Sequence, residues 1–219
     1  MKLYYSPAAC SLAVHIVARE ANIPIDLVKV DIGSHRLAGG IDFYRINPRG
    51  YVPVLELEDG VRFTEVGALV QYIADLAPEV DLIAPVGTLD RLRTQSWLNF
   101  VATELHKSFS WLWHKETAES TKQTVIERLN RHFAELDVLF AQQLYLVGRT
   151  FTVADAYAFT ILNWAHMLRV DLKSFPALRA YVDRIGSRPR VREAMMAEGL
   201  IRKATSQIVL CTAGHPSDA

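Results

Sequence analysis

The chain has 219 residues, half of them hydrophobic, and its 24 basic side chains are balanced by 24 acidic ones. A chain of this length can bury a substantial core, as one large domain or as two small ones. The zero formal net charge argues against nucleic acid or an anionic membrane as a partner. No apolar run approaches the roughly 18 residues of a transmembrane helix. The first ten residues lack the apolar core of a secretory signal, so we expect a cytoplasmic protein.

The opening segment predicts a strand, a helix and a second strand. Residues 2–5 are strand-like and end at Ser6-Pro7, and apolar side chains recur at helical spacing from Leu12 to Val17. Residues 25–30 form the second predicted strand, and the intervening helix imposes parallel pairing on the two strands. A looser polar stretch follows, with a short predicted helix at 41–46 before an Asn-Pro-Arg-Gly turn at 47–50.

Residues 52–64 predict a hairpin, because two short apolar runs flank the turn signal Asp59-Gly60. Pro53 stands at the head of the first strand, which suggests a cis peptide bond at Val52-Pro53. Such a bend would leave the backbone N–H and C=O of Val52 free to pair with an extended peptide. A helix from Glu65 to about residue 76 could receive a carboxylate at its first amides. The competing interpretation is an ordinary edge hairpin. The resulting order βαβαββα is the thioredoxin-like arrangement.

Residues 77–88 read as a linker, because Pro and Gly interrupt the pattern there and no later segment alternates like a strand. We therefore expect a thioredoxin-like domain at 1–80, an all-helical domain at 88–203 and a poorly ordered tail at 204–219. The first predicted helix of the second domain, at 89–113, carries an apolar stripe and a polar stripe. An amphipathic helix is expected at 121–143. The polar stripe consists of Leu92, Ser96, Asn99, Thr103 and His106.

Thr152 and Asp155 have the spacing of a capping box, in which each side chain accepts a hydrogen bond from a free amide at the helix start. Residues 156–168 are hydrophobic nearly all round, which predicts a buried central helix. We therefore interpret Tyr157, Trp164 and His166 as packing residues. Losing the Asp155 cap should cost about 1–2 kcal/mol. Two further helices are expected at 175–186 and 191–199.

Two cysteines, Cys10 and Cys211, lie far apart in the sequence and support neither a disulfide scaffold nor a zinc site. Cys10 comes where a strand ends and a helix begins, so the helix dipole is expected to lower the pKa of its thiol and make it a nucleophile. The alternative is that Cys10 is a small buried hydrophobe. Ala13 occupies the position where a thioredoxin has its second cysteine, which excludes internal disulfide cycling at this site.

His106, with Lys107 beside it, would form the second wall of a cleft between the domains if the polar stripe faces the first domain. A lone histidine on a helix is as readily a hydrogen-bonded structural group, and both interpretations stay open on this evidence.

Several short motifs together resemble a bacterial beta-class glutathione transferase, in order and without large gaps over residues 1–203. They are Cys10-Ser11, NPRGYVP at 47–53, Thr64-Glu65, Asn99 with TELHK at 103–107, and FTVADAY at 151–157. The resemblance implies a thioredoxin-like domain that binds glutathione, a helical domain that supplies the pocket for a hydrophobic electrophile, a homodimer, and no metal. Glutathione would be the co-substrate.

The resemblance also implies roles for individual residues. Cys10 would contact the glutathione sulfur, Val52 beside Pro53 would pair with its cysteinyl backbone, and Glu65 with Val66 would hold its γ-glutamyl end. His106 and Lys107 would close the site, and the remaining implied binding residues are Ser11, His35, Tyr51, Asn99 and Thr103. Three positions depart from the family's pattern. His35 replaces a common lysine, Tyr51 a Gln or Lys, and Val66 a Ser or Gly, so weaker glutathione binding is expected.

The leading hypothesis is an enzyme that joins glutathione to small apolar electrophiles. Thiol exchange through a mixed disulfide of Cys10 with glutathione is a second activity to consider. The alternative from a different class is a noncatalytic carrier of hydrophobic ligands. A purely structural module is disfavoured because Cys10, Val52-Pro53 and Glu65 occur together. The sequence does not name the electrophile.

Overall fold

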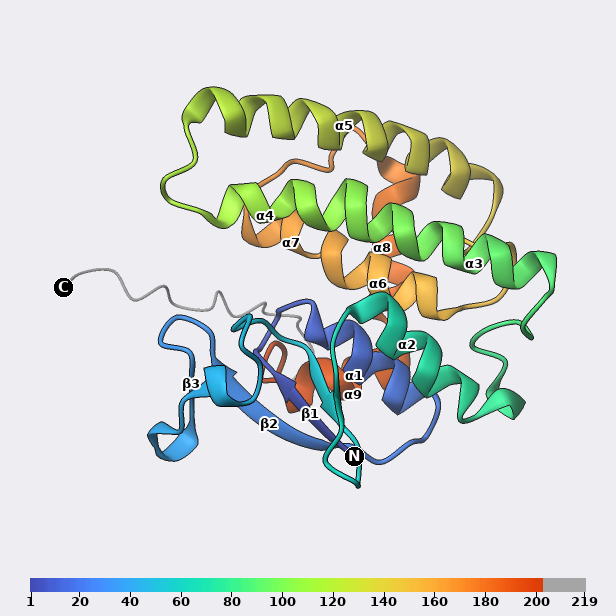
Figure 1. The fold of residues 1–219 in the computed structure, drawn as a ribbon. Coiled ribbons are helices and arrows are strands. Elements are labelled where there is room, and N and C mark those ends of the chain that lie inside the picture. The colour runs from blue at the N-terminus through green and yellow to red at the C-terminus, as the bar shows by residue number, and fades with distance from the viewer. Residues whose placement is uncertain (203–219) are drawn as a thin grey trace.

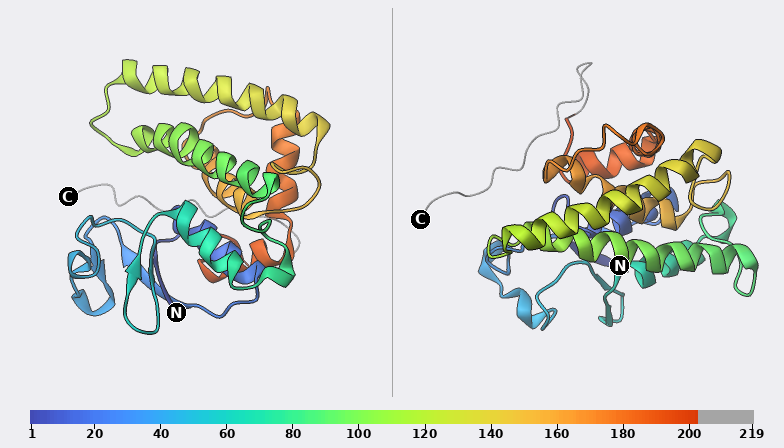
Figure 2. Two further views of the ribbon diagram at one scale, coloured as in Figure 1. Left: turned by 45° about the vertical axis from the view of Figure 1, so that its right-hand side comes forward. Right: turned by 90° about the horizontal axis from the view of Figure 1, so that it is seen from above.

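The computed structural model describes residues 1–202. The predicted tail at 204–219, residue 203 and Cys211 lie outside the described residues. Figure 1 shows a part that contains the strands, coloured blue to teal, and a layer of long helices in green and yellow. The left view of Figure 2 shows the same separation. The domain boundaries given above stay predictions.

The strands form one mixed sheet in the order β3-β2-β1-β4-β5. β1 pairs with β2 in parallel and with β4 antiparallel, so the predicted strand–helix–strand unit is confirmed. Apolar side chains of β1 and β4, such as Leu3 and Leu55, are fully buried. The strands are β1 (Lys2–Tyr5), β2 (Asp26–Asp31), β3 (Arg36–Leu37), β4 (Val54–Glu56) and β5 (Arg62–Phe63).

The helix predicted at 41–46 is reduced to a single 3₁₀ turn, η2 (Phe43–Arg45), in which Asp42 caps the amide of Tyr44. β3 was not predicted, because two residues give no alternation to detect. The helix predicted from the apolar spacing of Leu12 to Val17 is present as α1 (Ser11–Glu20), which extends three residues beyond that run. The helix predicted from Glu65 to about residue 76 is present within about a residue, as α2 (Val66–Asp75).

The rest of the described chain is helical. The predicted helix at 89–113 is interrupted by a π-helical segment, η4, in which the backbone hydrogen bonds span five residues instead of four. The elements in order are α3 (Leu89–Phe100), η4 (Val101–His106), α4 (Lys107–Trp113), α5 (Glu119–Gln142), α6 (Val153–Leu162), α7 (Trp164–Met167), α8 (Pro176–Gly186) and α9 (Pro189–Ala197). None of the helices within residues 1–202 has both the length and the apolar character that crossing a membrane requires.

The capping box that opens α6 is confirmed, and every residue of α6 is buried. The predicted single helix over 156–168 is instead divided at Asn163 into α6 and the short α7. Burial ends within α7, where His166 is exposed, so the prediction that His166 packs in the core is wrong. Tyr157 and Trp164 are buried as predicted.

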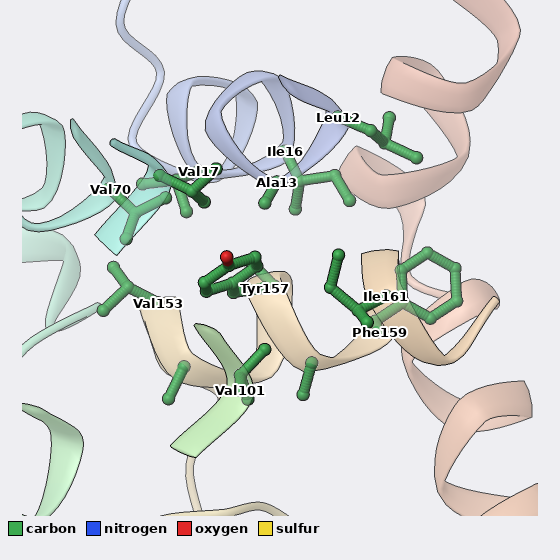
Figure 3. Close-up of a cluster of buried hydrophobic side chains, with 14 of the residues drawn as sticks. Leu12, Ala13, Ile16, Val17, Val70, Val101, Val153, Tyr157, Phe159 and Ile161 are labelled. Atoms are coloured by element: carbon green, nitrogen blue, oxygen red, sulfur yellow. The ribbon is translucent and has the colours of Figure 1, made fainter. Parts of the chain in front are cut away.

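The two parts of the molecule share one core, in which α1 packs against both α6 and α9. Figure 3 shows side chains of α1, including Ala13, Ile16 and Val17, facing Tyr157 and other residues of α6. The last helix within residues 1–202, α9, thus packs against the strand-containing part. Just before α9, the guanidinium of Arg188 forms two hydrogen bonds with the carboxylate of Glu20, at 2.7 and 2.9 Å.

Candidate functional site

Cys10 closes the loop between β1 and α1, and its side chain points at the hairpin. The Sγ atom donates a hydrogen bond to the carbonyl oxygen of Val52 at 3.3 Å, and the residue is 8 % exposed. Burial raises the pKa of the Cys10 thiol to about 12, although the amides at the helix start and the charge of Lys107 act in the opposite direction. The prediction of a lowered pKa is therefore wrong, because desolvation of the thiolate outweighs the helix start.

Val52 precedes a cis peptide bond to Pro53, as predicted. Its carbonyl is not free, because it accepts the thiol of Cys10. Its backbone N–H donates to no acceptor within residues 1–202. Val52 is half-buried and Pro53 is buried, whereas Tyr51 between Gly50 and Val52 is 69 % exposed. The bend therefore presents one unused donor and one carbonyl with a remaining lone pair to an approaching peptide.

Glu65 directly precedes α2 and has a left-handed backbone, with φ 71°. Such a conformation costs a non-glycine residue about 1–3 kcal/mol and often occurs where a ligand binds. The carboxylate is exposed and lies 3.3 Å from the guanidinium of Arg49. Its charge contributes to raising the pKa of Cys10, so the two residues lie within electrostatic range. Val66, the first residue of α2, is 5 % exposed.

His106 ends the π-helical segment, and it is half-buried beside two aromatic residues of the central helices. Its Nδ1 lies 2.7 Å from the hydroxyl of Tyr157, and its ring meets the indole of Trp164 edge to face at 5.1 Å. Burial raises the pKa of Tyr157, and the negative charge of Glu65 adds to that shift, so the Tyr157 hydroxyl lies within electrostatic range of Glu65. His106 is thereby linked through Tyr157 to the part of the molecule that holds Cys10.

The predicted polar stripe does not continue to His106. Asn99 and Thr103 are exposed, and each side chain donates to a carbonyl one turn earlier in the same helix, on Gln95 and Asn99 respectively. The π-helical segment changes the helical register before His106, and His106 is half-buried against Tyr157 and Trp164, whereas Asn99 and Thr103 are exposed. Lys107 is exposed, and its charge only partly opposes the rise that burial causes in the pKa of Cys10.

We expect His106 to be neutral at physiological pH, because burial and the neighbouring charge of Lys107 lower its pKa from 6.5 to about 4. In a nuclear magnetic resonance titration, the His106 ring signal should shift with a midpoint near pH 4. The His106→Asn variant identifies that signal. Because the unfolded chain binds this proton more readily, the free energy of unfolding should fall as the pH drops from about 6.5 towards 4. A midpoint near 6.5 would mean that the ring is solvated.

Two further predicted site residues, Ser11 and His35, form hydrogen bonds within the protein. Ser11 is fully buried, and its hydroxyl donates to the carbonyl of Ser6 at 3.3 Å and accepts from the amide of Ser6. His35 lies with its Nδ1 3.2 Å from the carbonyl oxygen of Gly50, and its ring packs on Tyr44. A side chain at Gly50 would meet both rings at under 3 Å, so this close approach requires glycine.

Tyr157 and Trp164 were placed in the core by the sequence, and they are buried, but their contacts with His106 were missed. A hydrophobic run gives no sign of which members turn a polar atom towards a distant histidine. Within residues 1–202, no group of three or more His, Cys, Asp or Glu side chains has a metal-binding arrangement.

Two family models match this chain: the glutathione S-transferase N-terminal domain over residues 3–81, and the glutathione S-transferase C-terminal domain over residues 100–189. The glutathione S-transferase GstA of Escherichia coli O157:H7 is 42 % identical over 200 residues, which cover 91 % of this chain and all of that protein. The structure of a sphingomonad glutathione S-transferase complexed with glutathione is 41 % identical, with a TM-score of 0.87 over 91 % of this chain and all of the other.

The structure of a bacterial beta-class glutathione S-transferase from Sphingomonas chungbukensis is 40 % identical, with a TM-score of 0.88 over 92 % of this chain and all of the other. Identity at this level over nearly the whole of both chains leaves little room for a different family. The chain therefore belongs to the glutathione S-transferase family, in agreement with its resemblance to the bacterial beta class.

Proposed function

We propose that this protein joins the sulfur of reduced glutathione to small hydrophobic electrophiles. The extended tripeptide would pair with the backbone of Val52, and its γ-glutamyl group would meet Glu65 and the first amide of α2 at Val66. In the reaction the glutathione thiol loses its proton, its sulfur bonds to the electrophilic carbon, and the leaving group departs. Activity then depends on donors that stabilise the glutathione thiolate.

One observation carries this proposal: Cys10 Sγ lies 3.3 Å from the Val52 carbonyl, with Glu65 and Lys107 in electrostatic range of the thiol. A peptide held at Val52 would therefore bring its own sulfur next to Cys10. Because the pKa of Cys10 is raised to about 12, this side chain is a protonated thiol at neutral pH. Its single S–H donates to the Val52 carbonyl in this structure and would turn to the sulfur of a bound glutathione. Cys10 is thus suited to stabilise the sulfur of glutathione during conjugation.

Thiol exchange through a Cys10–glutathione mixed disulfide is a second activity that the same site could support. It needs the Cys10 thiolate, which the raised pKa disfavours in the ligand-free protein. We therefore propose conjugation, and not thiol exchange, as the main activity. A noncatalytic carrier on the same fold is separated from both by one assay: turnover of a generic aryl halide with glutathione, which a carrier does not support.

Glu65→Gln should weaken glutathione binding with little change in stability, because the exposed carboxylate is proposed to meet the ammonium group of the ligand. We expect the dissociation constant measured by calorimetry to rise by about tenfold, the loss of one charge-assisted contact. Glu58→Gln, on the exposed hairpin turn, is the matched control. An unchanged constant for Glu65→Gln would place the γ-glutamyl group elsewhere.

The proposal includes a homodimer, a role in detoxification and a cytoplasmic location, where reduced glutathione predominates. Large apolar side chains exposed on β5, α2 and α3 are consistent with a self-association surface, and include Phe63, Tyr72, Leu89 and Leu92. Sedimentation velocity would give twice the 24.6 kDa chain mass for a dimer. The site roles of Ser11, His35, Tyr51, Asn99 and Thr103 remain part of the proposal, with Ser11 acting through the loop that it braces.

A further inference from the structure

The loop that carries Cys10 contains a residue whose backbone conformation needs support. Ala8, two residues before Cys10, has φ 62° and is 8 % exposed. A left-handed conformation is unfavourable for an alanine, because its Cβ approaches a carbonyl oxygen. Contacts elsewhere in the molecule must therefore hold Ala8 in this conformation.

Two side chains from the C-terminal half of the chain supply those contacts. The amide of Ala8 donates to Oε2 of Glu198 at 3.2 Å. The carbonyl of Ala8 accepts from the indole Nε1 of Trp164 at 2.7 Å. These groups belong to the peptide units on either side of Ala8. Anchoring both units fixes the two backbone torsions of that residue, and with them the direction in which the chain enters α1 at Cys10.

Glu198 directly follows α9 and is 6 % exposed, so hydrogen bonds must compensate for the burial of its carboxylate. Its Oε1 accepts from Nδ1 of His15 at 3.0 Å, and Nε2 of His15 accepts from Nε of Arg19 at 3.3 Å. Because Arg19 donates to Nε2, the proton of His15 lies on Nδ1. Burial raises the pKa of Glu198, and the hydrogen bond from His15 opposes that shift.

A carboxylate is an unfavourable way to dock one helix against another, since an apolar side chain of similar volume would serve at least as well. A carboxylate does what an apolar side chain cannot do: it accepts the amide of Ala8. The carboxylate of Glu198 therefore serves the loop through Oε2, in addition to the contact of Oε1 with His15 of α1.

We propose that Glu198 and Trp164 are positioning residues, which hold Ala8 and thereby set Cys10 Sγ against the carbonyl of Val52. This inference rests on the proposed function, because it concerns the alignment of the thiol that faces glutathione. It makes the alignment of a residue at the start of the chain depend on the helical part, through α7 and the end of α9. Neither Glu198 nor Trp164 was singled out for such a role by the sequence.

The test uses Glu198→Gln in the full chain carrying Cys211→Ser, so that Cys10 is the sole thiol. A glutamine has one acceptor oxygen, so it does not serve both Ala8 and His15. We expect kcat for conjugation to fall by about tenfold, as small misplacements of a reacting group do, with KM for glutathione changed by less than about twofold. Alkylation of Cys10 by iodoacetamide without glutathione should become several-fold faster, as the thiol leaves Val52.

Glu20→Gln is the matched control, because it weakens the contact of Glu20 with Arg188 at the other end of α1. It should lower the denaturation midpoint as Glu198→Gln does, while kcat and the alkylation rate stay at the parent values. Trp164→Phe removes the second anchor while keeping an aromatic ring, and should accelerate alkylation in the same direction. The alkylation rate of Trp164→Phe also tests the proposal if Glu198→Gln does not fold.

Equal alkylation rates in the parent, Glu198→Gln and Trp164→Phe would overturn the proposal and leave these side chains as structural contacts. Equal changes in Glu20→Gln would do the same. A parent protein without turnover of any electrophile would contradict the proposed function, whereas the alkylation rates would still test the positioning.

Discussion

Replacing Asp155 by alanine is expected to lower the free energy of unfolding by about 3–5 kcal/mol, because several buried donors lose their acceptor at once. The carboxylate is fully buried. Its Oδ2 accepts from the amide and the hydroxyl of Thr152 at 2.8 and 2.9 Å. Its Oδ1 accepts from the amide of Leu146 at 2.8 Å and from the hydroxyl of Tyr181 at 3.0 Å. The effect therefore exceeds the 1–2 kcal/mol of an ordinary helix cap.

Equilibrium unfolding in urea measures this difference. Asp137→Ala is the matched control, because Asp137 is a half-buried aspartate that accepts a single hydrogen bond, from the amide of Leu178 at 2.9 Å. Its loss should cost about 1 kcal/mol. Equal losses for the two variants would show that the contacts of Asp155 with Leu146 and Tyr181 contribute nothing to stability.

Some of these contacts can be predicted from the sequence, and others cannot. The bonds of Asp155 with Thr152 follow from a spacing of three residues, which any helix start with this pattern would share. Leu146 lies nine residues before Asp155 and Tyr181 lies 26 after it. No local pattern pairs them with that carboxylate. The position of the cap was predictable, whereas most of its expected energy depends on tertiary packing.

The candidate site divides in the same way. The cis peptide at Val52-Pro53 and the helix start after Glu65 follow from local residue types, and both are present. The direction of His106 was not predictable, because the π-helical segment before it changes the register that a regular helical count assumes. The sign of the Cys10 pKa shift was also missed. A helix start is visible in the sequence, but the extent to which a thiol is withdrawn from water is not.

Cys10 in the folded, ligand-free protein should react with iodoacetamide far more slowly than an ordinary thiol. Its pKa is raised to about 12 by burial, and the thiolate is the reacting species. At pH 7.5 the rate should lie about 10³-fold below that of the same residue in the urea-unfolded chain, where the pKa returns to roughly 8.5. In the folded protein the rate should still rise about tenfold per pH unit up to pH 10, since the thiol stays largely protonated there.

The measurement is mass spectrometry of the Cys10 peptide over time, which separates it from the Cys211 peptide in one sample. Oxidised glutathione gives the second arm: the Cys10 thiolate attacks the disulfide, a mixed disulfide forms, and one glutathione thiolate leaves. This adduct should also form faster as the pH rises, and Cys10→Ala should abolish it at this peptide. In the chain carrying Cys211→Ser no second cysteine remains to resolve the adduct, so it should persist until an external thiol is added. A Cys10 that reacts as fast in the folded protein as in the unfolded chain would show that its thiol is not withdrawn from water, and would contradict the raised pKa.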